Sequence, residues 1–413
     1  MKKTVSLILA IVLALTLVAC QSKNPVKTKN TPSKESTDLF TENVTDPPLA
    51  ETRAPSGEVE YTVVIPLVYD SADSFQEGLA VVGIDGKYGI IDRDGNKIIP
   101  AIYDVLQNFE DGLAPAMEGD KCGYIDKIGY EAVPFIYESM YIFSEDTGGV
   151  CLNDKWGFVD KEGKEVISFK YDDVRPFYEG MAAASMDGKW GFIDKAGNEV
   201  VPVIYDDMGY AFYEGMACVG LDGRFGFVDV TGELVIPIKF DSISRFEEGL
   251  AKVSIDGKYG LIDTTGNEVI PLKYEYLWGF AEGLAAVMLD GKWGYVDKAG
   301  DTVLPPIYYE ASSLFEGLAV ISDKEYGDPD GKYGCIDKNG TIVIPFVYDS
   351  IFSFKEGYAL VGIGEIGSRK WGFIDKTGKV VVPLVYDAAS WFSEGLAAVM
   401  LEDRWGYIAI KDM

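Results

Sequence analysis

Apolar and polar residues follow one pattern that recurs from Tyr61 onward. Each copy carries an apolar segment of the type VIPxxY, then a segment GLAxV, then an aromatic residue with Gly and an apolar pair. In residues 283–308, GLAAVML and KWGYVDK flank Asp290-Gly291, a pair typical of tight hairpins because it tolerates positive φ. Asp297-Lys298-Ala299-Gly300 then predicts a type I turn, and DTVLPPIYY predicts another strand. Every copy is therefore expected to form an antiparallel β-meander.

Both faces of this meander carry apolar groups. Trp293 and Tyr295 are expected on one face of their strand and Val296 on the other, since side chains alternate along a strand. One unit is thus unstable alone and must pack against its neighbours, as in repeat proteins. We interpret the aromatic rings first as core residues and second as sugar platforms. Pro202 and Pro237 lack an amide donor, which places the VIP strand at a sheet edge or a bulge.

Ten copies of the pattern fill residues 61–413. Their aromatic-Gly pairs lie 34 or 35 residues apart, except for 40 residues from Trp293 to Tyr333 and 38 from Tyr333 to Trp371. The copies resemble the bacterial WG-repeat family along almost all of this range. Departures are Cys122 in place of an aromatic ring, a disturbed Glu-Gly step near Glu145, and Ser168 in place of a proline.

The fold class expected is all-β, an array of about ten 34-residue meanders in an open or superhelical arrangement. The alternative is one or two closed β-propellers. Counting from each VIP segment gives ten whole units, which fits closure, but propellers usually hold about four to eight blades.

The N-terminal region predicts a leader and a tether before the array at residues 59–413. Lys2 and Lys3 precede nine apolar residues at 7–15, too few for a bilayer span of about 20 residues, so residues 1–19 are predicted to be a signal peptide. The following sequence, Leu17-Val18-Ala19-Cys20, resembles the lipobox of bacterial lipoproteins. The resemblance implies a diacylglycerol on Cys20 and an extracytoplasmic protein anchored by lipid to the bacterial cell membrane or envelope. Residues 20–58 are polar and rich in Ser, Thr and Pro, which predicts a disordered tether.

Composition narrows the functions that remain. With 37 Lys and Arg against 66 Asp and Glu, the net charge of −29 repels nucleic acid. The chain has no histidine, which excludes His-based triads and most transition-metal sites. The recurring Asp and Glu-Gly residues are interpreted as turn residues, because a glycosidase needs two particular carboxylates rather than a repeated one. We expect no catalytic residues, no metal ligands and no cofactor, with calcium at stacked carboxylates as the alternative.

Four cysteines follow Cys20, at positions 122, 151, 218 and 335, and no two occupy the same repeat position. They do not predict a disulfide framework. Cys151 is expected to face Trp156 across its hairpin, and a bond between Cys122 and Cys151 remains an alternative to four small core residues.

Three classes of function are compatible with this sequence. We expect a non-catalytic interaction module that binds an envelope protein, a peptide or a glycan. A structural spacer of the envelope and a glycan-hydrolysing enzyme are the alternatives. A binding surface would break the repeat symmetry with exposed aromatic residues, a spacer would keep all repeats alike, and an enzyme would show one cleft with unique polar groups.

The two longer spacings mark the candidate binding face. They add residues within 322–331 and 362–370, between the same two strands of consecutive copies, so both extended hairpins are expected at one edge of the array. An acidic tip beside a glycine-rich one suits a basic partner or a calcium ion, and neutral drift at a hairpin tip is the alternative. The candidate residues are Asp323, Glu325, Tyr326, Asp328, Asp330, Glu365 and Arg369.

Overall fold

The computed structural model describes residues 61–325, 328 and 330–411. All regular structure in this part of the chain is β-strand, and it contains no helix that could cross a membrane. The signal peptide, the lipidated Cys20 and the tether predicted above, as well as Tyr326, lie outside the described residues.

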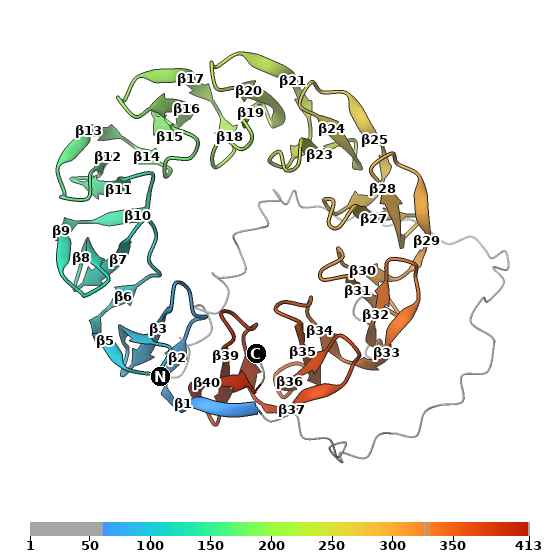
Figure 1. Ribbon diagram of the computed structural model, residues 1–413. Helices are drawn as coiled ribbons and strands as arrows, with labels where there is room; N and C mark the ends of the chain where they lie inside the picture. Colours follow the sequence, from blue (N-terminus) through green and yellow to red (C-terminus); the bar gives the residue numbers. More distant parts are fainter. Residues whose placement is uncertain (1–60, 326–327, 329, 412–413) are drawn as a thin grey trace, which may run out of the picture. The chain divides into compact units, whose positions relative to one another are not determined.

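Ten antiparallel sheets of four strands each form the described array (Figure 1). Each sheet is called a blade here, from blade 1 (β2–β5) to blade 9 (β34–β37), and blade 10 contains β38, β39, β40 and β1. The innermost strands are β2 (Ser71–Ala72), β6 (Val105–Leu106), β10 (Ser139–Ser144), β14 (Asp173–Val174), β18 (Asp207–Met208), β22 (Ser242–Ile243), β26 (Tyr276–Leu277), β30 (Glu310–Ala311), β34 (Ser350–Ile351) and β38 (Ala388–Ala389).

The second strands of the blades are β3 (Leu79–Ile84), β7 (Leu113–Glu118), β11 (Thr147–Leu152), β15 (Met181–Met186), β19 (Met216–Leu221), β23 (Leu250–Ile255), β27 (Leu284–Leu289), β31 (Leu318–Ser322), β35 (Tyr358–Ile363) and β39 (Ala397–Leu401). The third strands are β4 (Lys87–Asp92), β8 (Lys121–Asp126), β12 (Lys155–Val159), β16 (Lys189–Asp194), β20 (Arg224–Asp229), β24 (Lys258–Asp263), β28 (Lys292–Asp297), β32 (Tyr333–Asp337), β36 (Lys370–Asp375) and β40 (Arg404–Ile410).

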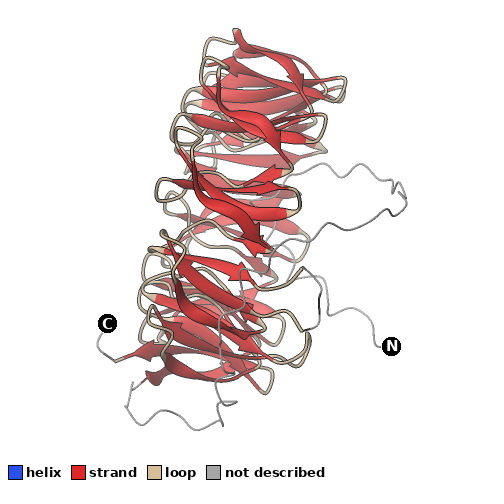
Figure 2. Cartoon of the chain, turned by 90° about the vertical axis from the view of Figure 1, so that its right-hand side faces the viewer, coloured by secondary structure: helices blue, strands red, loops and turns tan. Residues whose placement is uncertain are grey.

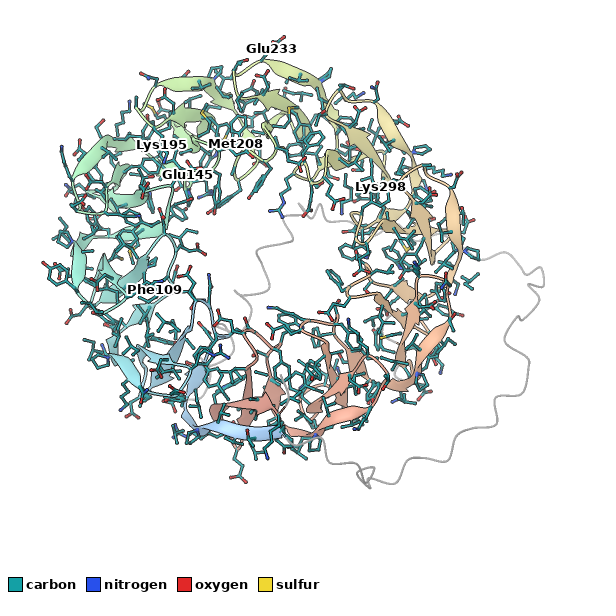
Figure 3. All side chains as sticks on the ribbon, viewed as in Figure 1. Phe109, Glu145, Lys195, Met208, Glu233 and Lys298 are labelled. Carbon is teal, nitrogen blue, oxygen red and sulfur yellow. The ribbon has the colours of Figure 1, made fainter. Side chains whose placement is uncertain are left out.

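The outermost strands carry the VIP segments and lie at the periphery in Figure 1. They are β5 (Lys97–Tyr103), β9 (Glu131–Tyr137), β13 (Glu165–Tyr171), β17 (Glu199–Tyr205), β21 (Leu234–Phe240), β25 (Glu268–Tyr274), β29 (Thr302–Tyr308), β33 (Ile342–Tyr348), β37 (Val380–Tyr386) and β1 (Tyr61–Tyr69). Among the residues labelled in Figure 3, Met208 of β18 lies toward the centre of the ring and Glu233, just before β21, at its periphery.

The array closes into a ring of ten blades, a β-propeller arrangement. Strand β1 pairs antiparallel with β40, from Tyr61 opposite Ile410 to Tyr69 opposite Trp405. The Tyr407 hydroxyl of blade 10 also donates to the Asp73 carbonyl of blade 1 at 2.7 Å. The all-β class and the ten meanders are confirmed, whereas the open array that we favoured is replaced by the closed alternative. Closure is favourable because the pairing of β1 with β40 satisfies backbone groups that would be unpaired at two open sheet edges.

The turns follow the predicted chemistry. Asp290 and Gly291 have φ values of 51° and 70°, the two positive angles of a type I′ hairpin. The Gly300 amide donates to the Asp297 carbonyl at 2.9 Å, and Gly300 takes φ 82°. Both turns predicted from residues 283–308 are confirmed.

The glycine of each aromatic-Gly pair lies where the outer strand bulges. Trp293 pairs with Tyr308 and Tyr295 pairs with Leu304. The interval of two residues on β28 therefore lies opposite an interval of four residues on β29, which makes β29 bulge. A Cβ on Gly294 would lie 2.6 Å from the Leu304 carbonyl oxygen. Only glycine permits this backbone contact. The proline of the VIP segment lies in this bulged edge strand, as predicted.

The hydrophobic core lies between neighbouring blades, since buried residues of blades 4 and 5 form one cluster. Figure 2 shows the blades from the side as successive sheets. The fully buried rings occupy two other repeat positions: Phe192, two residues after its aromatic-Gly residue, is fully buried, and its ring lies 4.7 Å from that of the equally buried Phe212 in the next blade. Trp190 itself is only half-buried. The expectation that aromatic-Gly rings are the core plugs is therefore corrected, because the bulged outer strand covers only part of them.

Candidate functional site

The two extended hairpins join equivalent strands of adjacent blades. One links β31 to β32 in blade 8, and the other links β35 to β36 in blade 9. The structure therefore places both insertions at the same edge of neighbouring blades. No hydrogen bond or ion pair connects the described residues of one hairpin with those of the other.

Polar groups of the candidate residues are engaged within their own hairpins. Asp323 accepts a hydrogen bond from the Lys332 amide at 2.8 Å. Carboxylate oxygens of Asp328 and Asp330 lie 3.8 and 4.0 Å from the Lys324 ammonium. The Arg369 Nε donates to the Gly364 carbonyl at 3.1 Å.

For Glu325 and Glu365, the backbone carbonyls accept turn hydrogen bonds from Asp328 and Ser368. The described residues include no group of three or more His, Cys, Asp or Glu placed to hold a metal ion.

The repeated aspartates of the Asp-Lys-x-Gly turns organise those turns. Asp194 Oδ1 accepts the amides of Ala196 at 2.9 Å and Asn198 at 2.8 Å, and the same pair of bonds recurs in other blades. The Asn198 side chain and these amides lower the pKa of Asp194. This agrees with their interpretation as turn residues.

The Glu-Gly pairs have a second role that sequence reasoning missed. Each Glu takes a positive φ, 51° for Glu179, in a tight turn that closes on the second strand. Its carboxylate reaches the next blade, where Glu179 accepts the amides of Glu214 and Gly215, both at 2.8 Å. Related contacts recur from blade to blade, including Gly78 of blade 1 bonding to Glu394 of blade 10 at 2.9 Å. Such carboxylate–amide bonds join most pairs of neighbouring blades, whereas Glu77 and Glu248 contact the next blade through the ammonium groups of Lys127 and Lys298.

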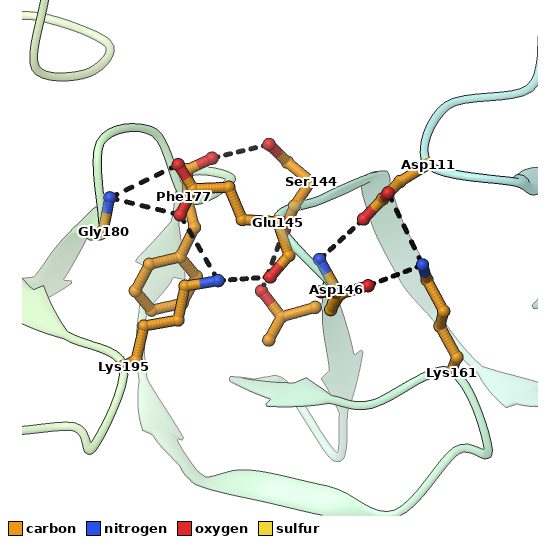
Figure 4. Close-up of polar contacts among 9 residues, drawn as sticks. Asp111, Ser144, Glu145, Asp146, Lys161, Phe177, Gly180 and Lys195 are labelled. Atoms are coloured by element: carbon orange, nitrogen blue, oxygen red, sulfur yellow. Dashed lines mark hydrogen bonds and ion pairs between the residues drawn. The ribbon is translucent and has the colours of Figure 1, made fainter.

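Lysines reinforce these contacts at several junctions. Figure 4 shows the Lys195 ammonium of blade 4 beside Glu145 of blade 3, with a carboxylate oxygen at 3.3 Å, while Glu145 also accepts the Gly180 amide at 3.1 Å. Blades 5 and 6 carry Val230 and Thr264 at the position of this lysine. The sequence held a signal for the role of these glutamates in joining blades. Glu is uncommon at a turn position with positive φ, which favours Asn, Asp or Gly.

A second set of ion pairs joins blades through the aspartate that follows the VIPxxY segment in most copies, where Glu138, Glu275 and Tyr309 are the exceptions. Asp104 accepts the Lys87 ammonium of blade 1 at 2.6 Å and the Gly119 amide of blade 2 at 2.8 Å. The hydrogen bond from Lys87, followed by that from Gly119, lowers the pKa of Asp104. The prominent carboxylates of both sets are thus structural.

Symmetry is broken just after the innermost strands, where aromatic and cationic side chains gather. Arg175 follows β14 in blade 4, and its guanidinium lies 5.0 Å from the Trp190 ring, 5.5 Å from Tyr141 in blade 3 and 5.9 Å from Tyr210 in blade 5. It is paired with Asp173 at 2.9 Å. The corresponding positions in blades 1, 2 and 8 are Asp73, Gln107 and Ser312.

A second cluster lies between blades 6 and 7. The Lys252 ammonium is 4.5 Å from the Tyr276 ring centre, 5.7 Å from Trp278 and 5.9 Å from Tyr259. Trp278 also stacks on Trp293, with ring centres 6.2 Å apart and planes inclined by 12°. We call Lys252, Tyr259, Tyr276, Trp278 and Trp293 the Lys252 cluster.

The sequence offered a signal for this cluster. Lys252 is the charged residue in a segment, GLAxV, whose variable position is apolar or small in other copies. The aromatic surroundings of Lys252 cannot be read from the sequence, because the rings come from two blades and their approach depends on how the blades pack.

The four described cysteines are free thiols. Cys151 lies opposite Trp156 as predicted, but Cys122 and Cys151 are not bonded to each other. Burial raises the pKa of Cys335 to about 12, so this thiol is a core residue with little thiolate character at neutral pH.

Comparisons with known proteins support the repeat assignment. The model of the family "WG containing repeat" matches ten segments: residues 62–88, 88–122, 123–156, 156–190, 190–224, 225–259, 259–293, 293–325, 333–365 and 371–405. No curated protein matches the chain.

Solved structures are only distantly similar. A eukaryotic initiation factor is 12% identical with a TM-score of 0.48, covering 74% of this chain and 95% of that one. The WD40 domain of SCAP from fission yeast is 10% identical with a TM-score of 0.33, covering 86% and 98%. Likenesses at this level carry no argument about function, whereas the repeat matches extend over most of the sequence. The chain belongs to the WG containing repeat family.

Proposed function

We propose that this protein is a lipid-anchored, extracytoplasmic binding module of a bacterial envelope, whose propeller engages a protein, peptide or glycan without catalysing a reaction. The observation that carries the proposal is the break in symmetry described above. A spacer needs identical blades, whereas here partly exposed aromatic and cationic side chains gather beside the innermost strands of blades 3 to 7. Rigid aromatic anchors of this kind are typical of binding surfaces.

The repeated carboxylates favour the same proposal over an enzyme. The Glu-Gly and Asp-Lys-x-Gly residues accept backbone amides or lysines, as Glu179 and Asp194 do. Their role in joining blades accounts for their recurrence without a reaction. The extended hairpins of blades 8 and 9 remain a second candidate face, with Asp330 and Glu365 at their tips.

Photo-crosslinking in cells tests the proposal. A benzophenone amino acid is placed in the full-length chain at Tyr210, which is 39% exposed, at Glu365, or at the peripheral residue Glu233 as the control. We expect a discrete adduct from Tyr210 or Glu365 that is missing for Glu233. Equal yields at all three positions would favour a spacer.

The anchor is tested separately. A fatty-acid probe should label the wild-type protein, and Cys20→Ser should abolish the label. Undiminished labelling of the variant would contradict lipid attachment at Cys20.

A further inference from the structure

Lys252 is a cation in an apolar position. It lies on β23, where the neighbouring blades carry Cys218 and Ala286 at the equivalent place. Directly after the aromatic-Gly pair, blade 6 has Leu261 where blades 5 and 7 have Phe227 and Tyr295. Leu261 lies directly opposite Lys252 on the paired strand, and the Lys252 ammonium lies 4.5 and 5.7 Å from the Tyr276 and Trp278 rings of blade 7.

The ammonium has no anionic partner in the described part of the chain. The ammonium donates a hydrogen bond to the Tyr276 hydroxyl at 3.4 Å, and no carboxylate of the described residues lies within 4.0 Å of it. Desolvation lowers the pKa of Lys252, which agrees with an ammonium that lacks a counter-ion. Arg175 makes a useful contrast, because its aromatic surroundings are similar but Asp173 already neutralises it.

The rings around Lys252 remain partly accessible. Tyr259, Tyr276, Trp278 and Trp293 are all half-buried, and Lys252 is half-buried among them. The near-parallel indoles of Trp278 and Trp293 offer flat apolar surface, while the tyrosine hydroxyls add hydrogen-bonding groups. This combination suits a ligand with an apolar ring face, hydroxyl groups and one negative charge.

We propose that the Lys252 cluster binds an acidic sugar residue of a glycan, with the carboxylate at Lys252 Nζ and the pyranose ring against the exposed aromatic faces. The proposal rests on the proposed binding function and deepens it by naming the ligand class. An anion restores the charge balance that burial of an unpaired ammonium disturbs. An acidic peptide would satisfy the charge as well, but it offers no pyranose ring with an apolar C–H face, so the aromatic surface favours the sugar.

Titration calorimetry on the full-length chain in detergent tests this assignment. The probes are tetragalacturonate and sialyllactose, with the methyl ester of tetragalacturonate as the uncharged counterpart and tetraglutamate as the peptide. We expect at least one acidic sugar to bind, Lys252→Met and Trp278→Ala to weaken it at least tenfold, and the methyl ester to bind weakly to all forms. Lys258→Met, on the exposed side of the same blade, is the matched control and should bind like wild type.

Several results would overturn the assignment. One is that neither acidic sugar binds. Another is that Lys252→Met keeps its melting temperature and binds the sugar as tightly as wild type. The third is that tetraglutamate binds as tightly as the sugars. Lys252→Gln gives a second folded variant if Lys252→Met unfolds. Because crosslinking at Tyr210 or Glu365 needs no acidic sugar, the binding function can hold while this inference fails.

Discussion

Replacing Gly294 by Ala should damage blade 7 because the outer strand crosses directly over this residue. The added Cβ would meet the Leu304 carbonyl oxygen at 2.6 Å and the Pro306 nitrogen at 2.7 Å, both backbone atoms that cannot rotate away. Overpacking of this kind costs about 1–3 kcal/mol. With an unfolding entropy of about 2.1 cal/mol/K per residue over roughly 350 residues, that cost lowers Tm by about 1–4 °C if the ring melts as one unit.

Gly279→Ala is the matched control in the same blade. Nothing lies within 4 Å of a Cβ built there, and its φ is not positive. Ala should therefore be neutral or stabilise the fold by about 0.4–1 kcal/mol, since it restricts the unfolded chain.

Urea unfolding followed by tryptophan fluorescence, together with calorimetric melting, measures both variants. We expect a lower unfolding midpoint for Gly294→Ala and an unchanged or higher midpoint for Gly279→Ala. A wild-type midpoint for Gly294→Ala, or equal destabilisation of both variants, would contradict the proposed backbone clash.

Three further predictions concern closure, packing and charge. Deleting residues 61–69 should expose the β40 edge, lower Tm and promote self-association seen by size-exclusion chromatography, and an added peptide of that sequence should reverse both effects if β1 closes the ring. Phe192→Ala should cost about 3–5 kcal/mol in urea unfolding and Trp190→Ala clearly less, because only the first ring is fully buried; equal losses would contradict this. The hydrogen bond from Lys189 lowers the pKa of Asp206, so its stabilisation is complete above the unfolded pKa of about 3.9 and is lost as pH falls through the lower folded pKa. In Lys189→Met, an NMR titration should show a higher pKa for Asp206 than in the wild type. An unchanged pKa would show that Lys189 is not what lowers it.

Local structure was predictable because it depends on neighbouring residues. Asp290-Gly291 specifies its turn by backbone preference alone, and the prolines of the VIP segments cannot lie inside a sheet. The number of meanders follows from the spacing of the aromatic-Gly pairs.

Contacts between blades were not predictable in the same way. Closure depends on the rotation between successive blades, and a small angle summed over ten blades decides between a ring and a spiral. The Glu179 carboxylate reaching Gly215, and Lys252 reaching Trp278, likewise depend on that rotation. The burial of Trp190 also depends on how neighbouring blades pack, so the sequence could not show that this ring is half-buried rather than fully buried.

The pairing of β1 with β40 also has a consequence for the order of folding. Blades 1 to 9 each come from one continuous stretch, so they can form locally as the chain emerges. Blade 10 must wait for its last strand, and bringing the ends of a flexible segment of roughly 340 residues together would cost about 5 kcal/mol in entropy. Stacked blades reduce that cost by holding both ends nearly in place. We therefore expect the ring to close last and slowly, with β1 unprotected from hydrogen exchange until β40 has been synthesised.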